Sequence, residues 1–182
     1  MNDDDSQLLL LASTGDRRAL ALLYDRYRGV LYAFCLRILA DASLAEDAVQ
    51  ETFLKLRSQG AGISNPGALR SWLYRVARNE ALGMIRSRRN GTAVDPDAVW
   101  DAETPHSSLE RKDEGAVVRS ALAGLRQEYR EVIILREYDG LSYAEIAAVT
   151  GDTESSVKSR LFKARKAIAE RLAPWWKERI QR

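Results

Sequence analysis

The stretch from Leu141 to Leu172 most constrains the fold of this chain, because it sets two helical apolar patterns on either side of a single glycine. Gly151 supplies the backbone freedom that a tight turn between two helices needs. Asp152 or Thr153 can then cap the second helix. Apolar residues recur in that helix at helical spacing and predict a buried face of Val157, Leu161, Ala164 and Ile168. The stretch therefore predicts a helix-turn-helix.

The opposite face of the second helix has a composition suited to DNA. Helical geometry points away from the core a set of small polar, aromatic and basic residues: Ser155, Ser159, Phe162, Lys163 and Lys166, with Lys158, Arg160 and Arg165 on the flanks. Small polar side chains can approach base edges while the cations around them neutralise phosphates. Residues 154–171 hold six Lys or Arg and two Glu, a net charge of +4. A solvated basic helix is the alternative interpretation, but the turn and the preceding scaffold helix favour DNA binding.

Charge is segregated along the chain, although the net charge of the whole sequence is only +2. Residues 70–89 contain six Arg and one Glu, a net charge of +5, whereas residues 90–115 contain seven Asp or Glu and two basic residues, a net charge of −5. The length of 182 residues and the hydrophobic content of 46% leave room for one large or two small domains. An acidic block between two basic ones predicts two domains and a linker.

Cysteine usage and the amino-terminal sequence point to the cytoplasm. Cys35 is the only cysteine and lies in an apolar helical pattern, so neither a disulfide framework nor a thiolate cluster is expected within the chain. The first residues lack a basic segment, and their apolar run of about four residues is far shorter than the roughly twenty needed to span a bilayer. We therefore expect a cytoplasmic protein without membrane insertion.

The first ninety residues read as a succession of helices. After a frayed acidic tip at 3–5, we expect a short helix over 6–14 and a core helix over 16–40. Ser43 and Glu46 form the pattern of a capping box and predict a third helix over 44–57. Its inner face is predicted to be Ala45, Ala48, Val49, Thr52, Phe53 and Leu56.

The outer face of this third helix groups acidic residues with an exposed leucine: Asp47, Gln50, Glu51 and Leu54. Such a face is a candidate docking surface. Acidic residues near a helix start also complement the helix dipole, which accounts for Glu46 and Asp47 but less well for Glu51 and Leu54. From the residues alone both interpretations stay open.

A polar loop over 58–67, with Asn65 as a cap and Pro66 at the first helical position, precedes a fourth, basic helix. Its inward residues are predicted to be Leu69, Leu73, Val76 and Met84. Its outward residues are predicted to be Ser71, Arg75, Arg78, Leu82, Arg86 and Arg89, with Asn79 beside them. A row of arginines along one helix suggests tracking of phosphates. Trp72 and Tyr74 can stack on unpaired bases, but aromatic residues at helical spacing are more often core, so we rank them below the arginines.

Residues 90–115 contain two prolines and no periodicity, and they read as a flexible acidic linker between two small helical domains of an all-α protein. The expected domains are 1–89 and 116–182, and Pro174 is expected to end the recognition helix. His106 lies in the linker without ligand partners, so no metal site or cofactor is expected. No carboxylate cluster or nucleophile with a base is visible, and we expect no enzymatic activity.

Four segments resemble, in the order of the family, signatures of the extracytoplasmic-function (ECF) class of bacterial RNA polymerase sigma factors. They are LYDRY (23–27), AEDAVQETFLKL (45–56), SWLYRVARN (71–79), and LREYDGLSYAEIA with VKSRLFKAR (135–147 and 157–165). The resemblance covers nearly the whole chain. It implies an alternative sigma factor that binds core RNA polymerase and promoter DNA and that is controlled by a separate anti-sigma protein.

The resemblance also implies roles for residues. Asp47, Gln50 and Glu51 would dock on the polymerase clamp helices, and Leu54 shares their face. The loop over 58–65 and the helix bearing Arg75, Arg78 and Asn79 would engage the −10 element, and Ser71 and Arg86 lie on the same outward row. The −35 element would meet Ser155, Ser156, Lys158, Ser159, Arg160 and Lys163, and Lys166 continues that face. The acidic linker would thread through polymerase towards the RNA exit path.

Some positions depart from the family pattern. Leu125-Arg126 stands where Leu-Pro is usual, Ser155-Ser156 where Gly-Thr is frequent, and Gly83 where Asp is common. The first two bear on the promoter sequence, and the third on how the basic helix ends. A stand-alone helix-turn-helix regulator is the alternative class, but it would leave the second basic helix and the acidic face unexplained.

Overall fold

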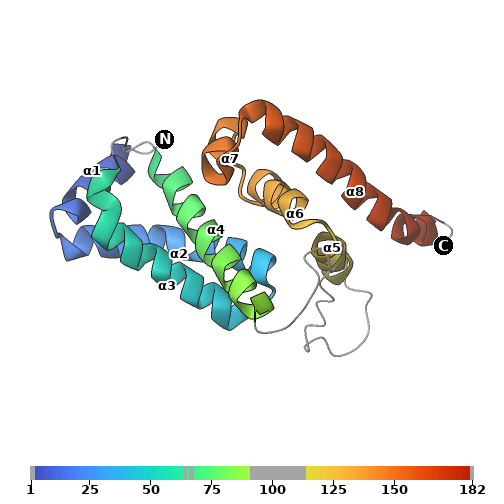
Figure 1. Ribbon diagram of the computed structural model, residues 1–182, viewed down its shortest axis with the longest axis horizontal. Coiled ribbons are helices and arrows are strands. Elements are labelled where there is room, and N and C mark those ends of the chain that lie inside the picture. The colour runs from blue at the N-terminus through green and yellow to red at the C-terminus, as the bar shows by residue number, and fades with distance from the viewer. Residues whose placement is uncertain (1–2, 64, 66–67, 91–113, 181–182) are drawn as a thin grey trace.

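The computed structural model describes residues 3–63, 65, 68–90 and 114–180. In these residues the chain is helical and contains no strand, which confirms the all-α prediction. Figure 1 shows two groups of helices, α1–α4 and α5–α8, which lie side by side. The expected linker falls almost wholly on residues 91–113, outside the described residues, and His106 lies there with it.

The first group is built around α2 (Arg17–Leu39), which packs on α3 (Ala42–Gln59), on α1 (Asp3–Ser13) and on α4 (Leu69–Asn90). Asp16 caps α2 by accepting from the backbone N–H of Arg18 at 2.8 Å and of Ala19 at 3.2 Å. A 3₁₀ turn, η1 (Gly60–Gly62), follows α3. Cys35 is fully buried, as its apolar surroundings in the sequence predict.

Two expectations about helix starts are wrong. The cap of α3 is Asp41, whose carboxylate accepts from Leu44 N–H at 3.1 Å, so Ser43 and Glu46 lie inside the first turn and form no capping box. The acidic tip is tied down, because Asp4 and Asp5 pair with Arg26 and the Tyr27 hydroxyl donates to Asp5 at 2.7 Å. A capping side chain is effective only at the first non-helical residue, and an aspartate already occupies that place.

The second group consists of α5 (Glu114–Ala123), α6 (Gln127–Ile133), the π-helical turn η3 (Ile134–Tyr138), α7 (Tyr143–Thr150) and α8 (Glu154–Ile180). Arg130 holds the α5–α6 connection, since its guanidinium donates to the carbonyls of Leu122, Ala123 and Leu125. α8 does not end at Pro174, contrary to expectation, and continues to Ile180. Proline removes a single backbone donor, and the helix spans that gap instead of ending there.

The buried apolar residues form one continuous cluster that runs through both groups. α4 packs on α2 and α3 within its own group and on α7 across the junction, where α2 also contacts α6 and η3. Phe34 and Tyr74 meet edge to face at 5.2 Å between α2 and α4. Tyr74 is buried and Trp72 packs against the cluster, which confirms their ranking as core residues.

Candidate nucleic-acid and protein interfaces

The helix-turn-helix has the local structure that its sequence predicts. Ser142 and Glu145 form a capping box at the start of α7, and Gly151 ends that helix with a φ of 77°. Thr153 caps α8, since its hydroxyl accepts from Ser156 N–H at 3.2 Å. Val157, Leu161 and Ala164 are buried and Ile168 is half-buried, so the inner face of α8 is fixed against the domain.

The opposite face of α8 is open to solvent. Ser155, Ser159, Lys163 and Lys166 are exposed, and Phe162 is 72% exposed on the same side. Lys158 is also exposed, and its Nζ lies 5.5 Å from the centroid of the Tyr143 ring. Cations therefore surround a row of short polar side chains, an arrangement that can neutralise phosphates and admit base edges.

Two predicted members of this surface are less available. Ser156 is half-buried at the helix start. Arg160 pairs with Asp152 through two hydrogen bonds of 2.6 and 3.2 Å, and this contact lowers the pKa of the Asp152 carboxyl. Asp152 is thus a structural partner of Arg160 instead of the helix cap that the sequence left possible.

The basic helix α4 divides its predicted outward residues into two groups. Arg75, Asn79 and Arg86 are exposed, as the helical spacing predicts. Ser71 is only 8% exposed, and the Arg78 side chain is 19% exposed, so the prediction that both face solvent is wrong. For Arg78 the reason is tertiary, because the second group of helices packs on α4 and supplies the carboxylate of Glu131.

Arg78 forms an ion pair with a buried carboxylate of the second group. Its Nε donates to Oε2 of Glu131 at 2.7 Å, and Glu131 is 2% exposed. Gln127 donates to the other oxygen of Glu131 at 3.0 Å. Glu131 lies among apolar residues of α6, and nothing in the sequence indicates that its partner is Arg78, 53 positions away.

Arg70 and Asp139 form a second polar cluster at the junction. Arg70 donates to the backbone carbonyl of Asp139 and lies 3.7 Å from a carboxylate oxygen of Glu145. Burial raises the pKa of the Asp139 carboxyl to about 6, although Arg37, Tyr74 and Arg70 favour the charged form. Its Oδ2 is buried and accepts no hydrogen bond from any described residue.

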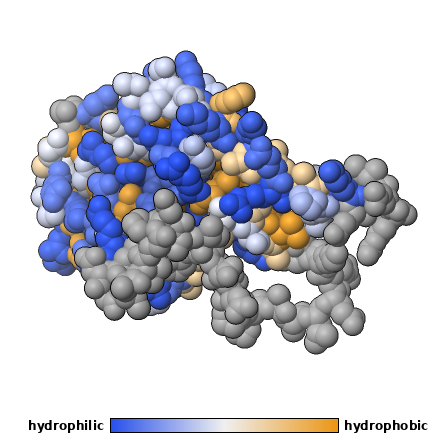
Figure 2. All heavy atoms as spheres, turned by 45° about the vertical axis from the view of Figure 1, so that its right-hand side comes forward, coloured by the Kyte–Doolittle hydropathy of each residue, from blue (hydrophilic) through white to orange (hydrophobic). Residues whose placement is uncertain are grey.

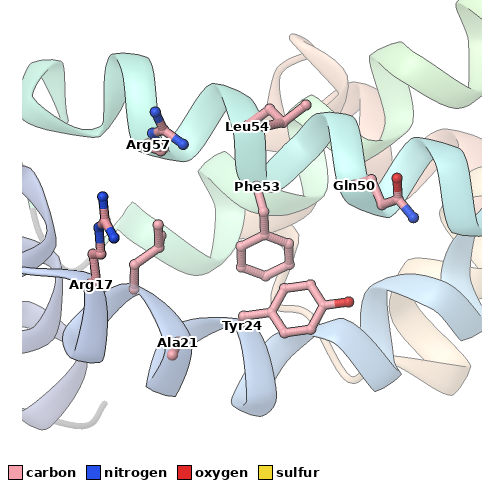
Figure 3. A pocket seen from close by; sticks show the side chains of 8 residues that line it. Arg17, Ala21, Tyr24, Gln50, Phe53, Leu54 and Arg57 are labelled. Carbon is pink, nitrogen blue, oxygen red and sulfur yellow. The ribbon is translucent and has the colours of Figure 1, made fainter.

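The acidic face of α3 is exposed as predicted. Asp47, Gln50 and Glu51 face solvent, and Leu54 is 54% exposed. Two of them also line a groove of about 450 Å³ between α2 and α3 that the sequence did not reveal, together with Arg17, Leu20, Ala21, Tyr24, Phe53 and Arg57. Figure 3 shows Phe53 pointing from α3 towards Tyr24 on α2, and their rings meet at 4.9 Å.

Other predicted features fall partly outside the described residues. In the loop over 58–67, positions 64, 66 and 67 are not described, and neither is the side chain of Arg89.

The face in Figure 2 is largely hydrophilic, with smaller apolar areas between the charged residues. Over the described ranges, three or more His, Cys, Asp or Glu side chains nowhere gather closely enough to hold a metal ion. None of the described helices is both long and apolar enough to cross a membrane.

Two family models match the chain. Sigma-70 region 2 matches residues 23–91, which run from within α2 to just past the end of α4. Sigma-70 region 4 matches residues 116–168, which contain the helix-turn-helix. The two matches divide between the two groups of helices.

Relatives and solved structures extend this similarity over nearly the whole chain. The chain is 34% identical to an RNA polymerase sigma-H factor of Pseudomonas aeruginosa over 97% of each protein. It is 35% identical to the ECF RNA polymerase sigma factor SigL of Mycobacterium tuberculosis, covering 86% of this chain and 90% of that protein. A structure of CnrH in complex with the cytosolic domain of CnrY is similar with a TM-score of 0.72 and 29% identity, covering 94% of this chain and 99% of CnrH. The sigma factor RpoE of Bartonella quintana, solved with the anti-sigma factor NepR, is similar with a TM-score of 0.65 and 29% identity, covering 84% and 96%.

Proposed function

This chain belongs to the ECF family of RNA polymerase sigma factors, and from that membership we propose which of its surfaces meet polymerase and promoter. It is an alternative sigma factor that binds core RNA polymerase and directs promoter-specific transcription initiation. Sigma factors are DNA-binding initiation factors, and we assign this chain no catalytic chemistry of its own. Because it works with polymerase, we propose that it resides in the cytoplasm.

The division into domains follows the charge pattern. We assign residues 1–89 to polymerase docking and the −10 element, residues 116–182 to the −35 element, and residues 90–115 to a linker. The two family matches, at 23–91 and 116–168, support this assignment.

The polymerase-docking surface is the outer face of α3, with Asp47, Gln50, Glu51 and Leu54. Supporting this assignment, these residues are exposed, and Gln50 and Leu54 lie on the rim of the α2–α3 groove. Acidic residues beside an apolar groove suit a partner helix that presents basic and large apolar side chains.

The −35 surface is the outer face of α8, with Ser155, Ser156, Lys158, Ser159, Arg160, Lys163 and Lys166. The observation that carries this assignment is the exposure of the central serines and lysines on a helix whose other face is buried. Short polar residues flanked by cations are the composition expected of a recognition helix in the major groove.

The −10 surface is the outer face of α4, with Ser71, Arg75, Arg78, Asn79 and Arg86. Arg75, Asn79 and Arg86 are exposed and available in the free chain. Ser71 is buried, and Arg78 is paired with Glu131 of the second domain, so contact of Arg78 with DNA requires the two domains to separate.

A separate anti-sigma protein is a further partner in this proposal. CnrH was solved with the cytosolic domain of CnrY, and the Bartonella quintana sigma factor with the anti-sigma factor NepR. Both structures are similar to this chain over most of its length, which supports a partner of the same kind.

The decisive experiment is co-purification with core polymerase followed by run-off transcription. Wild-type protein is expected to bind core polymerase and to open its promoter selectively. The Asp47→Lys, Glu51→Lys variant should lose polymerase binding while its stability changes by no more than about 0.5 kcal/mol, because both residues are exposed. Equal loss of folding would make this face structural. Tight, sequence-specific DNA binding by the protein alone, with no effect of core polymerase, would favour a stand-alone regulator.

A further inference from the structure

The basic helix α4 is not free in this chain, because the second domain packs against it. The contact combines apolar packing with interdomain contacts made by three arginines. Arg78 pairs with Glu131 at 2.7 Å, Arg70 contacts Asp139 and Glu145, and the Arg37 guanidinium lies 4.4 Å from the centroid of the Tyr138 ring. We call this packing of α2 and α4 on α6, η3 and α7 the closed arrangement.

Within the closed arrangement, Glu131 occupies the place that a phosphate would take on Arg78. A guanidinium presents its N–H groups in a planar fork that fits carboxylate and phosphate oxygens alike. The Nε of Arg78 is already used by Glu131, and the side chain is only 19% exposed. Arg78 therefore cannot hold Glu131 and reach DNA from the same position.

We propose that Glu131 is an internal competitor for promoter DNA, so that the closed arrangement is the resting form of the free chain and α4 binds DNA fully only after releasing it. This proposal rests on the proposed role of Arg78 in binding the −10 element. It assigns the face of α4 that bears Arg70, Tyr74 and Arg78 two successive partners, the second domain and then DNA.

The burial of Glu131 makes the exchange a linked event. At 2% exposure its carboxylate has Arg78 as its ion-pair partner, and a buried charge that loses such a partner is strongly unfavourable. If DNA takes Arg78, the least costly response is for the domains to separate and for water to hydrate Glu131. A ligand shifts such an equilibrium only through its different affinity for the two forms. Part of the free energy of DNA binding is therefore used to separate the domains.

The covalent connection strengthens the competition. Both domains belong to one chain, joined through residues 91–113, so the carboxylate is present near Arg78 at a high effective concentration. A modest interface therefore suffices to keep the arrangement closed when DNA is dilute. Core polymerase would oppose closure by holding each domain at its own promoter element.

The test compares two variants of the full-length protein that change net charge equally. Glu131→Gln removes the carboxylate that pairs across the junction and preserves its shape. Glu80→Gln is the matched control, because Glu80 pairs with Lys55 inside the first domain and its side chain is 20% exposed. Each variant loses one negative charge, so a general electrostatic gain in DNA binding is the same for both.

Two measurements on the free proteins decide the proposal. Small-angle scattering should give Glu131→Gln a larger radius of gyration than Glu80→Gln and wild type. Binding to single-stranded DNA of a −10-type sequence at about 150 mM salt should be stronger for Glu131→Gln than for Glu80→Gln, by a factor on the order of five to 100, the usual size of coupling between two sites. In an Arg78→Ala background this advantage should disappear.

Each departure from these results overturns the proposal. Equal radii for the two variants would show that Glu131 does not hold the domains together. A larger radius without tighter DNA binding would show that closure does not compete with DNA. Circular dichroism and thermal unfolding of both variants check that the helices persist. If the Glu131→Gln variant proves to be misfolded, a Glu131→Asp variant, which keeps the negative charge, should remain closed.

Failure of the proposed function gives a different result. If wild-type protein drives run-off transcription and the two variants bind DNA alike, the sigma-factor assignment stands and the competition is wrong. If wild-type protein fails to support transcription with core polymerase, the assignment of function is wrong, and the scattering comparison still decides whether Glu131 closes the chain.

Discussion

The outer faces of α4 and α8 carry similar residues but lie in different surroundings. On α8, the side chains of Ser159, Lys163 and Lys166 are exposed to solvent. On α4, Ser71 is buried and Arg78 is paired with a buried glutamate of the other domain. Helical periodicity thus identifies which side chains point out of their own domain. It does not determine whether another domain then covers them.

The largest expected effect of this difference is on stability. Arg78→Ala leaves the Glu131 carboxylate unpaired, and removing one partner of a buried pair typically costs about 3–5 kcal/mol. Because domain opening can hydrate Glu131, we expect a smaller loss, about 2–3 kcal/mol, in urea unfolding of the full chain. Arg75→Ala, on the exposed side of the same helix, should change stability by no more than about 0.5 kcal/mol.

Equal effects of the two alanine substitutions would remove the distinction between the two sides of α4. Since two domains need not unfold together, the urea transition should be followed both by circular dichroism and by tryptophan fluorescence. Coincident curves are required before one free energy of unfolding is assigned.

A second prediction uses Asp139, whose carboxyl is buried at the same junction with a pKa raised to about 6. In the unfolded chain its pKa is near 3.8, so the folded form binds more protons between about pH 4 and 6. The stability contributed by this group is therefore greatest below pH 4 and falls as pH rises through 6. Asp139→Asn should flatten this dependence, gaining about 1–2 kcal/mol over wild type between pH 4 and 7.5.

Burial raises this pKa, and the groups that oppose the rise all lie on the first domain, namely Arg37 on α2 and Arg70 and Tyr74 on α4. The pH dependence therefore also reports domain closure. Thermal unfolding at several pH values measures this dependence. Glu80→Gln is the control, because it leaves the interface between the domains unchanged. If Asp139→Asn parallels wild type at every pH, the carboxyl is hydrated and the junction is open in solution.

Local structure was largely predictable from the sequence. The helix-turn-helix, the Gly151 turn, the Thr153 cap and the buried face of α8 depend on neighbours within a few positions, where helical spacing is informative. Where two local signals competed, the prediction failed, as with Ser43 and Asp41 for the cap of α3. Pro174 was a wrong stop signal because the helix accommodates one missing donor.

The candidate surfaces were predictable only where a single domain determines them. The acidic face of α3 and the outer face of α8 are exposed as expected. The pairing of Arg78 with Glu131 and the groove beside Tyr24 each join segments distant in sequence, and a single sequence carries no signal for such contacts. The roles of these residues on polymerase and DNA stay predictions.

A third prediction compares two cations of α8. Lys163 is exposed, whereas Arg160 is held by Asp152. Lys163→Ala should lower affinity for −35 duplexes of any sequence by about fivefold at 150 mM salt and reduce the salt slope by about one, because one phosphate contact is lost. Arg160→Ala should also leave the Asp152 carboxylate without its partner. The negative charge of that carboxylate would then repel DNA. Fluorescence anisotropy over a salt series measures both, and an unchanged slope in Lys163→Ala would place that lysine away from phosphates.

The smallest effect is expected from the serines of the same face. Ser155 and Ser159 are exposed and Ser156 is half-buried at the helix start, and each hydroxyl can donate to or accept from one base edge. A single hydrogen bond contributes about 0.5–1.5 kcal/mol, less than a bidentate pair, so replacing one serine by alanine should alter base preference by about twofold to tenfold. The salt slope should not change, because no charge is removed.

Holoenzyme selection from a randomised −35 library, carried out for the serine variants and for Lys163→Ala, separates a change in preferred sequence from a loss of affinity. The lysine variant should keep the wild-type consensus at lower affinity, whereas the serine variants should shift it, and an unchanged consensus after replacing all three serines would remove them from the reading surface.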